Sequence, residues 1–346
     1  MRAYRIESWL APARLVEVAV PDPGAGQIRV RVAGCGLCHS DLAMGQIPAE
    51  VGAAMGWRVP FTLGHETAGW VDALGPGVAG LAEGDAVALA SPSSCGTCRW
   101  CRRGVENSCP AGLAGRGYGR DGGLADHVLV DDAWRVTLPL GSLDPAVAGP
   151  LTDAGATSHH AVARVLPRVH PGGTVVVLGV GGLGAFVVQL ASALCDARVV
   201  AVDPDPARRA VALDLGAHHA LEGVNEDTAV HLSSLLGRDP VDAVIDVVGT
   251  DATIALAAAV LAPSGALAVV GAAGGTFRRP WFAGLPRDAE VFTFQGSDLA
   301  DGRAVIALAE EGRLRVDVEA FALDDVADAY AALEAGTLGG RAVVRP

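Results

Sequence analysis

The chain has 346 residues, of which 51% are hydrophobic and 19% are charged, and its formal net charge is -13 at pH 7. A chain of this length usually folds into more than one domain, and this balance of residues excludes intrinsic disorder. The acidic charge argues against nucleic acid as a partner, because binding a phosphate backbone requires a concentrated basic surface.

All 26 basic residues are arginine, so the chain contains no lysine. This excludes a Walker A nucleotide site, a Schiff base with pyridoxal phosphate, and any dehydrogenase whose proton relay uses lysine. The N-terminal residues do not show a basic segment followed by an apolar one, which is the pattern of a secretory signal peptide. We therefore expect a cytoplasmic protein.

The first 150 residues read as short strands separated by glycine and proline. Residues 28–32 alternate in hydropathy, and further strands are expected at 70–74 and 86–90. This spacing predicts a twisted, barrel-like β-domain over residues 1–150. Residues 91–112, which contain a cluster of cysteines, are expected to project from it as a lobe.

Cys95, Cys98, Cys101 and Cys109 form a C-x2-C-x2-C-x7-C run, which takes up four of the seven cysteines of the chain. In a reducing compartment, thiols this close together favour metal ligation over disulfides. Four thiolates can surround one tetrahedral zinc with Zn–S bonds of about 2.3 Å, and a site without an open position is structural. The run therefore predicts a structural zinc.

A second group of candidate metal ligands lies upstream. Cys38-His39-Ser40-Asp41 is followed by Gly64-His65-Glu66, so Cys38 and His65 offer two separated zinc ligands with acidic neighbours. Such a site leaves room for a substrate. The alternative is that Cys38 is a buried core cysteine, the role that we expect for Cys35.

After Pro150 the pattern changes to apolar strands that alternate with alanine-rich helices. Strands are expected at 175–178, 199–202, 243–247 and 267–270, and helices near 185–194, 207–215 and 252–261. This alternation predicts a doubly wound α/β domain over residues 151–295.

Two further segments need an assignment. Residues 171–195 carry no charge and are long enough to span a membrane, but four glycines interrupt them, so we expect a strand, a turn and a buried helix there. Residues 296–346 contain one more helix, expected at 303–311, and end in an apolar stretch at 341–345. We assign this last segment back to the first domain.

A glycine-rich turn follows the first strand of the α/β domain. Gly179-Val180-Gly181-Gly182-Leu183-Gly184 fits the pattern G-x-G-x-x-G between a strand and an apolar helix. Gly179 permits the tight turn, Gly181 lets the backbone approach a pyrophosphate, and Gly184 lets the helix pack closely. Together with Gly182 and Leu183 they form a predicted cofactor-binding turn. A strand-to-helix turn without a ligand is the alternative.

The next strand ends at Asp203, nineteen residues after Gly184. A carboxylate at this place hydrogen-bonds the adenosine ribose hydroxyls of a dinucleotide. It would repel a 2′-phosphate, so NAD is favoured over NADP. The alternative is that Asp203 only solvates the end of the strand.

Taken together, these motifs resemble the zinc-dependent alcohol dehydrogenases of the medium-chain dehydrogenase/reductase family, over essentially the full length. The resemblance rests on Gly36-Leu37-Cys38-His39-Ser40-Asp41, Gly64-His65-Glu66-Thr67-Ala68-Gly69, the four-cysteine lobe, Gly84-Asp85 and the glycine-rich turn, in the order of the family. It implies an α/β protein with a GroES-like β-barrel catalytic domain and a Rossmann domain with a doubly wound parallel sheet. It also implies reversible hydride transfer between a primary or secondary alcohol and NAD, giving an aldehyde or ketone.

The resemblance implies the ligands of a catalytic zinc. Cys38 and His65 correspond to the first two, and Asp153 stands where many relatives have a cysteine. A carboxylate keeps the charge of a thiolate, and zinc accepts oxygen at about 2.0–2.2 Å. Glu66 is a candidate fourth ligand or a neighbour that exchanges with substrate, and Asp41 is expected to orient His65. Asp153 has an alternative role as the cap of a helix that begins near residue 154.

Other roles also follow from the resemblance. Ser40 is expected to take the alcohol proton and pass it to the nicotinamide ribose, with an ordinary hydroxyl at a helix start as the alternative. His39 stands where the family often has arginine or histidine near the pyrophosphate. Relatives with a full proton relay often have a histidine where this chain has Ala43, so ordered water is the expected substitute.

The implied cofactors are NAD and two zinc ions per chain, one catalytic and one structural. The expected partner is a small-molecule alcohol or carbonyl compound, without nucleic acid or membrane, in a homotetramer or homodimer. Candidate pocket walls are the aromatic residues Trp57, Phe61, Trp281 and Phe282. The alternatives are a specialised dehydrogenase or reductase for a polyol, an amino-alcohol or a biosynthetic intermediate, and a non-catalytic binding protein on the same scaffold.

Overall fold

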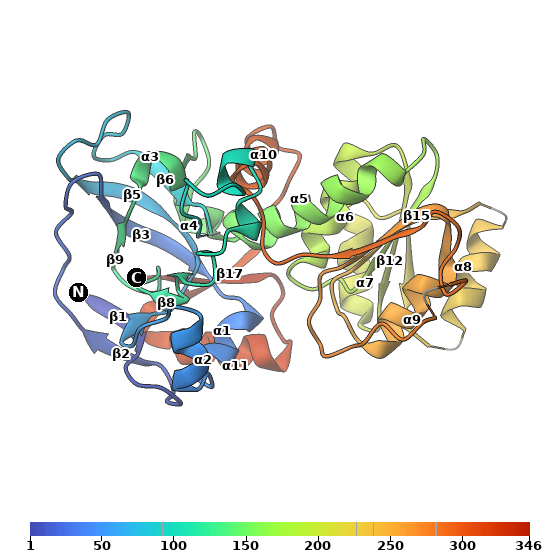
Figure 1. Cartoon of the computed structure of the whole chain (residues 1–346), viewed down its shortest axis with the longest axis horizontal. Helices are drawn as coiled ribbons and strands as arrows, with labels where there is room; N and C mark the ends of the chain where they lie inside the picture. The colour runs from blue at the N-terminus through green and yellow to red at the C-terminus, as the bar shows by residue number, and fades with distance from the viewer. Residues whose placement is uncertain (92, 226, 238, 281) are drawn as a thin grey trace. The chain divides into compact units, whose positions relative to one another are not determined.

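The computed structural model describes residues 1–91, 93–225, 227–237, 239–280 and 282–346. The chain forms two compact units, of which unit 1 comprises Met1–Ala156 with Gly296–Pro346, and unit 2 comprises Thr157–Gln295. Figure 1 shows their helices and strands coloured along the chain. Among the described residues, no helix has the length and the apolar character needed to cross a bilayer. The same holds for the helix within the segment 171–195.

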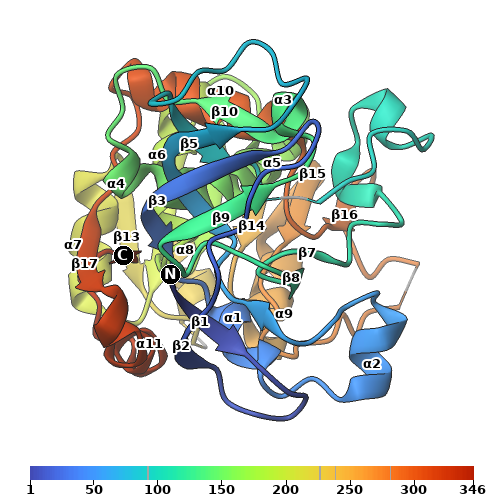
Figure 2. The same cartoon turned by 90° about the vertical axis from the view of Figure 1, so that its left-hand side faces the viewer.

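Unit 1 is built on β-sheets. The largest has the strand order β10-β6-β5-β3-β18-β17, and β9 pairs with β3 beside it. Its strands are β3 (Ile28–Gly36), β5 (Glu66–Leu74), β6 (Ala86–Leu89), β9 (His127–Val130), β10 (Thr137–Pro139), β17 (Val318–Ala322) and β18 (Arg341–Arg345). Figure 2 shows β3, β5 and β9 side by side. The strands expected at 28–32, 70–74 and 86–90 are β3, β5 and β6, and the first two are longer than expected.

Smaller elements complete unit 1. A three-stranded sheet has the order β2-β1-β4, and two short strands pair as β7-β8. Their bounds are β1 (Arg2–Ile6), β2 (Arg14–Glu17), β4 (Phe61–Thr62), β7 (Gly115–Arg116) and β8 (Gly119–Arg120). Short helices lie between strands: α1 (His39–Met44), α2 (Ala49–Ala54), α3 (Ala133–Val136), α4 (Pro145–Ala148), and the 3-10 turns η1 (Cys101–Arg103), η2 (Glu106–Ser108) and η3 (Gly149–Thr152).

The C-terminal segment lies in unit 1 because its last strand joins the large sheet. β18 runs antiparallel to β3, with Val343 opposite Gly36 and Val344 opposite Cys35. The end of the chain therefore packs against the strand that leads to Cys38. This segment also contains α10 (Leu299–Glu310), η5 (Leu323–Asp325) and α11 (Val326–Ala335). The helix expected at 303–311 is α10, which begins earlier, at Leu299.

Unit 2 is a six-stranded parallel sheet with the order β13-β12-β11-β14-β15-β16. Its strands are β11 (Thr174–Leu178), β12 (Arg198–Asp203), β13 (His219–Glu222), β14 (Val241–Asp246), β15 (Leu261–Val269) and β16 (Glu290–Thr293). The helices are α5 (Ala154–Val165), which begins in unit 1, then α6 (Gly184–Leu194), α7 (Pro206–Asp214), α8 (Thr228–Leu236) and α9 (Asp251–Val260), with η4 (Leu166–Arg168) after α5. The strand order reverses at β11, so right-handed crossovers place α6 and α7 on one face and α8 and α9 on the other.

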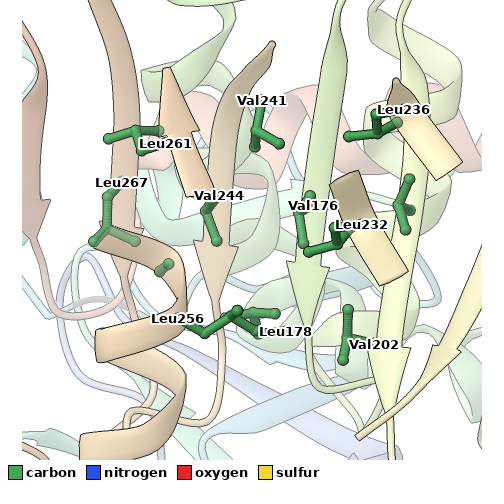
Figure 3. Close-up of a cluster of buried hydrophobic side chains, with 12 residues drawn as sticks. Val176, Leu178, Val202, Leu232, Leu236, Val241, Val244, Leu256, Leu261 and Leu267 are labelled. Carbon is green, nitrogen blue, oxygen red and sulfur yellow. The ribbon is translucent and has the colours of Figure 1, made fainter. Parts of the chain in front are cut away.

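The core of unit 2 explains why its strands read as continuous apolar runs. Val176, Leu178 and Val244 from the central strands are buried against Leu232 of α8 and Leu256 of α9 (Figure 3). Strands covered by helices on both faces have no solvent face and therefore do not alternate in hydropathy. The predicted doubly wound α/β fold is confirmed.

Candidate functional site

His65 is the centre of a buried polar cluster in unit 1. It lies between Gly64, whose φ is 95°, and the first residue of β5. Its Nδ1 is 3.1 Å from Asp41 Oδ1, and its Nε2 is 3.4 Å from Asp153 Oδ2. The two ring nitrogens therefore face two different carboxylates, and the ring orientation is set by both.

Three potential metal ligands converge at this cluster. The sulfur of Cys38, a ring nitrogen of His65 and a carboxylate oxygen of Asp153 all lie within 4.8 Å of one another. Cys38 directly precedes α1, His65 precedes β5, and Asp153 lies between η3 and α5, so three separate parts of the chain supply them. A sulfur, nitrogen and oxygen donor set with three protein ligands suits a zinc ion that keeps one position for substrate.

The charges around His65 favour a cation. Burial lowers the pKa of His65, but its neighbours Tyr118, Asp41 and Asp153 together raise this pKa well above the ordinary value. Asp41 is itself held in place, because its Oδ2 accepts the backbone N–H of Cys38 at 3.0 Å. A metal ion at Nε2 would supply the positive charge that this arrangement favours.

Glu66 is paired with an arginine in the interior of unit 1. Its Oε1 pairs with Arg341 Nη2 at 2.5 Å, and the same nitrogen donates to the Leu37 carbonyl at 2.9 Å. The Glu66 side chain is fully buried, and a Cβ on Gly36 would lie only 2.0 Å from its Oε2. The ligand role of Glu66 stays a prediction. Arg341 was missed by the sequence reasoning, since nothing in the C-terminal strand marks it as a partner of Glu66.

Ser40 has a partner that the sequence did not reveal. Its Oγ lies 3.0 Å from the hydroxyl of Tyr118, which is 3.1 Å from His65 Nε2. Burial raises the pKa of Tyr118 far above its usual range, so the phenol stays neutral. The only sequence signal was a tyrosine between two glycines, Gly117 and Gly119, and this pattern does not specify a contact.

The four-cysteine lobe has the dimensions of a zinc site. Ligand atoms of Cys95, Cys98, Cys101 and Cys109 lie within 4.8 Å of one another, with Sγ–Sγ distances of 3.5 Å for Cys98–Cys101 and 3.9 Å for Cys98–Cys109. A tetrahedron with Zn–S bonds of about 2.3 Å has edges of about 3.8 Å. Backbone N–H groups point at the sulfurs, and the N–H and hydroxyl of Thr97 lower the pKa of Cys95 to about 5. These contacts favour the thiolate form of Cys95, whereas burial raises the pKa of Cys101 to about 12.

The glycine-rich turn of unit 2 joins β11 to α6. Gly179 has a φ of 89°, and a Cβ on Gly184 would lie 1.9 Å from the Gly179 carbonyl, so the helix packs too closely for any larger residue. A Cβ on Gly181 would have no neighbouring atom within 4 Å, so this residue faces open space. Gly182 and Leu183 form the turn before α6. This backbone can therefore approach a pyrophosphate at the N-terminus of an 11-residue helix.

Asp203 is hydrogen-bonded to that turn. Its Oδ2 accepts the N–H of Val180 at 2.7 Å and its Oδ1 accepts the N–H of Asp205 at 2.9 Å. Only 3% of the residue is exposed, so it does not serve merely to solvate a strand end. The carboxylate lies at the edge of the glycine-rich turn, and its role toward the ribose of a dinucleotide stays a prediction.

The other sequence candidates fall in varied places. His39 is exposed at the start of α1, and its role toward a cofactor stays a prediction. Cys35 is buried with its Sγ 3.7 Å from Thr67 Oγ1, and burial raises its pKa to about 12, as suits a packing residue. The aromatic candidates Trp57 and Phe61 are buried in edge-to-face contact, Phe282 is 75% exposed, and Trp281 lies outside the described residues.

Comparison with protein families gives two matches. Residues 24–140 match the alcohol dehydrogenase GroES-like domain, and residues 182–311 match the zinc-binding dehydrogenase domain.

Individual relatives match over the whole chain. A D-arabinose 1-dehydrogenase (NADP(+)) of Saccharolobus solfataricus is 30% identical over 100% of this chain and 97% of its own length. An NAD-dependent alcohol dehydrogenase of Sulfolobus acidocaldarius is 32% identical over 100% of this chain and 99% of its own. The crystal structure of the alcohol dehydrogenase from Aeropyrum pernix superposes with a TM-score of 0.89 at 31% identity, covering both chains completely.

Proposed function

Because the chain belongs to the zinc-dependent alcohol dehydrogenases of the medium-chain dehydrogenase/reductase family, we propose that Cys38, His65 and Asp153 hold its catalytic zinc. The protein is an oxidoreductase that transfers a hydride between an alcohol and NAD, reversibly giving an aldehyde or ketone. The observation that carries the proposal for the site is the convergence of the three donor atoms within 4.8 Å. Zinc held there would act as a Lewis acid and lower the pKa of an alcohol.

The residues around the proposed zinc ligands orient His65, accept the alcohol proton and balance the charge of the site. Asp41 holds His65 from the side opposite to Asp153, so that Nε2 is the nitrogen left for the metal. Ser40 accepts the proton of the alcohol hydroxyl and passes its own hydroxyl proton to the nicotinamide ribose. Arg341 neutralises Glu66, which would otherwise add a further negative charge to those of Cys38, Asp153 and Asp41. Among the proposed ligands, one thiolate and one carboxylate balance the two positive charges of zinc.

NAD binds unit 2 at the glycine-rich turn in this proposal. Gly179, Gly181, Gly182, Leu183 and Gly184 receive the pyrophosphate, and Asp203 receives the adenosine ribose. The role proposed for His39 is likewise toward the pyrophosphate. A bound NAD supplies the hydride acceptor, and the protein residues named here orient it.

The proposal includes a second zinc in the lobe, where four thiolates leave no coordination position for a substrate. We also propose a homo-oligomer, a tetramer or a dimer, located in the cytoplasm. Zinc analysis by mass spectrometry and sedimentation equilibrium test the metal count and the oligomeric state.

One assay tests the function and the metal together. Purified protein should reduce NAD in the presence of short primary and secondary alcohols, lose this activity on chelation, and regain it with added zinc. An Asp153→Asn variant that retains both the activity and a full zinc content would contradict the ligand set.

A sugar or polyol dehydrogenase is the second candidate. It is favoured by the relative named D-arabinose 1-dehydrogenase (NADP(+)) and by the polar groups Ser40 and Tyr118 at the cluster. The same assay with aldoses and polyols beside simple alcohols separates the two, because the better substrate class has the higher kcat/KM.

A further inference from the structure

Tyr118 lies beside the group that accepts the alcohol proton. Its hydroxyl is 3.0 Å from Ser40 Oγ and 3.1 Å from His65 Nε2. We propose that Tyr118 is a positioning residue for Ser40, whose oxygen accepts a hydrogen bond from the phenol and is thereby held toward the substrate hydroxyl. This inference rests on the proposed role of Ser40.

The backbone around Tyr118 is built for this close approach. Gly117 and Gly119, on either side, have φ values of 75° and 74°, which favour glycine. A Cβ on Gly117 would lie 2.8 Å from the carbonyl carbon of Gly64, and one on Gly119 would lie 2.5 Å from Trp57. Gly117 therefore lets the turn lie directly against Gly64, which precedes His65, and Gly119 lets it lie against Trp57.

The ring of Tyr118 is held between two other rings. Its centroid is 4.6 Å from that of His65, at an interplanar angle of 35°, and 6.2 Å from that of Trp57. Trp57 is itself buried, and its Nε1 donates to the Leu113 carbonyl at 2.6 Å. The phenol oxygen is thus held where it lies by packing as well as by its hydrogen bonds.

Metal binding leaves Tyr118 with one of these two neighbours as a hydrogen-bond partner. In the zinc-loaded protein His65 Nε2 is a ligand, so its lone pair is no longer available to the phenol. Ser40 Oγ remains, 3.0 Å away. A hydroxyl oxygen has two lone pairs and one proton, so a serine that accepts from Tyr118 keeps one lone pair for the alcohol proton.

The surroundings give Ser40 few other partners. Ala43, where relatives with a full relay often have a histidine, presents an exposed methyl group. Among the described residues, Tyr118 is the side chain that hydrogen-bonds Ser40. An ordered water would leave the Ser40 hydroxyl free to rotate, whereas a packed phenol fixes its direction.

A double-mutant cycle tests this role in the full-length, zinc-loaded enzyme. The variants are Tyr118→Phe, which keeps the ring and removes the hydroxyl, Ser40→Ala, and the double variant. We expect Tyr118→Phe to lower kcat about 10-fold, the loss of one well-placed hydrogen bond, with zinc content unchanged. In the Ser40→Ala background the same change should have no further effect, because Tyr118 acts through Ser40.

A binding measurement complements the kinetics, with Tyr4→Phe as the matched control. Tyr4 stacks on Tyr330 and has no place in the proposed site. The probe is trifluoroethanol, whose fluorine atoms disfavour hydride loss, so that its dissociation constant from the NAD-loaded enzyme reports binding without turnover. Tyr118→Phe should weaken this binding several-fold, and Tyr4→Phe should leave it unchanged.

The other outcomes are distinguishable. If Ser40→Ala lowers kcat but Tyr118→Phe does not, the inference on Tyr118 is overturned and the proposed site stands. If Ser40→Ala has no effect, the proposed role of Ser40 fails, and the inference fails with it. Loss of zinc from Tyr118→Phe, or two effects that multiply in the double variant, would also overturn the inference.

Discussion

The buried ion pair between Glu66 and Arg341 gives the sharpest test of how unit 1 is held together. Glu66 is fully buried and Arg341 is 8% exposed, and Nη2 of Arg341 reaches both the carboxylate and the Leu37 carbonyl. Replacing Arg341 by methionine keeps most of the side-chain volume and removes the charge. The variant would leave a carboxylate without a counter-charge in a site that water does not reach.

Two estimates give the size of the effect. Breaking a buried ion pair by removing one partner costs about 3–5 kcal/mol. Alternatively the carboxyl becomes protonated. For a carboxyl with an ordinary pKa of about 4.3, protonation at pH 7 costs roughly 3.7 kcal/mol. Both estimates lead to a loss of about 4 kcal/mol. For a unit of roughly 200 residues this lowers Tm by roughly 10 °C.

The loss should depend on pH with a definite sign. Burial raises the pKa of Glu66 and Arg341 lowers it, so removal of Arg341 raises this pKa further in the folded protein. The folded variant then binds a proton that the unfolded chain does not, and its stability increases as the pH falls. Between pH 7 and 5.5 the stability deficit of the variant relative to the parent should therefore shrink.

Urea denaturation of the zinc-loaded protein, followed by tryptophan fluorescence at both pH values, measures the deficit. The control is Arg345→Met, the same change at an exposed position of the same strand. Glu66→Gln combined with Arg341→Met should recover most of the stability, because no charge is then left unpaired. A deficit below about 1 kcal/mol, or one that does not change with pH, would refute the reasoning.

Three further predictions concern the metal and cofactor sites. Asp153→Asn should lose the catalytic zinc on dialysis while Asp153→Cys retains it, because only the latter restores an anionic ligand; equal zinc contents by mass spectrometry would contradict this. Cys98→Ser should lower the zinc content by one ion per chain and lower the Tm, since a structural zinc contributes directly to folding, and an unchanged zinc content would rule out the lobe site. Asp203→Ser should raise the dissociation constant of NAD about 10-fold, through loss of the ribose hydrogen bonds, and reduce the preference of the protein for NAD over NADP. Fluorescence titration with both cofactors measures the two dissociation constants. An unchanged ratio of these constants would refute the assignment of Asp203 to the ribose.

Local sequence patterns were sufficient to predict the central strands of unit 2. The strands β11 and β12 could be placed within a residue or two because buried parallel strands are continuous runs of β-branched residues. The strands β13 and β16 were missed, since their half-exposed residues lack such a run. Helices α8 and α11 were missed as well, because polar and apolar residues mix in them without a clear boundary.

The sequence by itself was enough to predict which residues carry the chemistry. Cys38, His65, the four lobe cysteines and the glycine-rich turn have motif spacings of a few residues, and short spacings restrict where side chains can point. They were enough to predict the family, the metal and the cofactor.

Only the tertiary structure decided which residues surround them. Arg341 meets Glu66 across 275 positions of sequence, and Tyr118 meets Ser40 across 78. These contacts depend on the pairing of β18 with β3 and on the packing of the turn at Gly117 against Gly64. No local pattern encodes such pairings, because strand order and close backbone approach are set by how the whole unit buries its apolar surface.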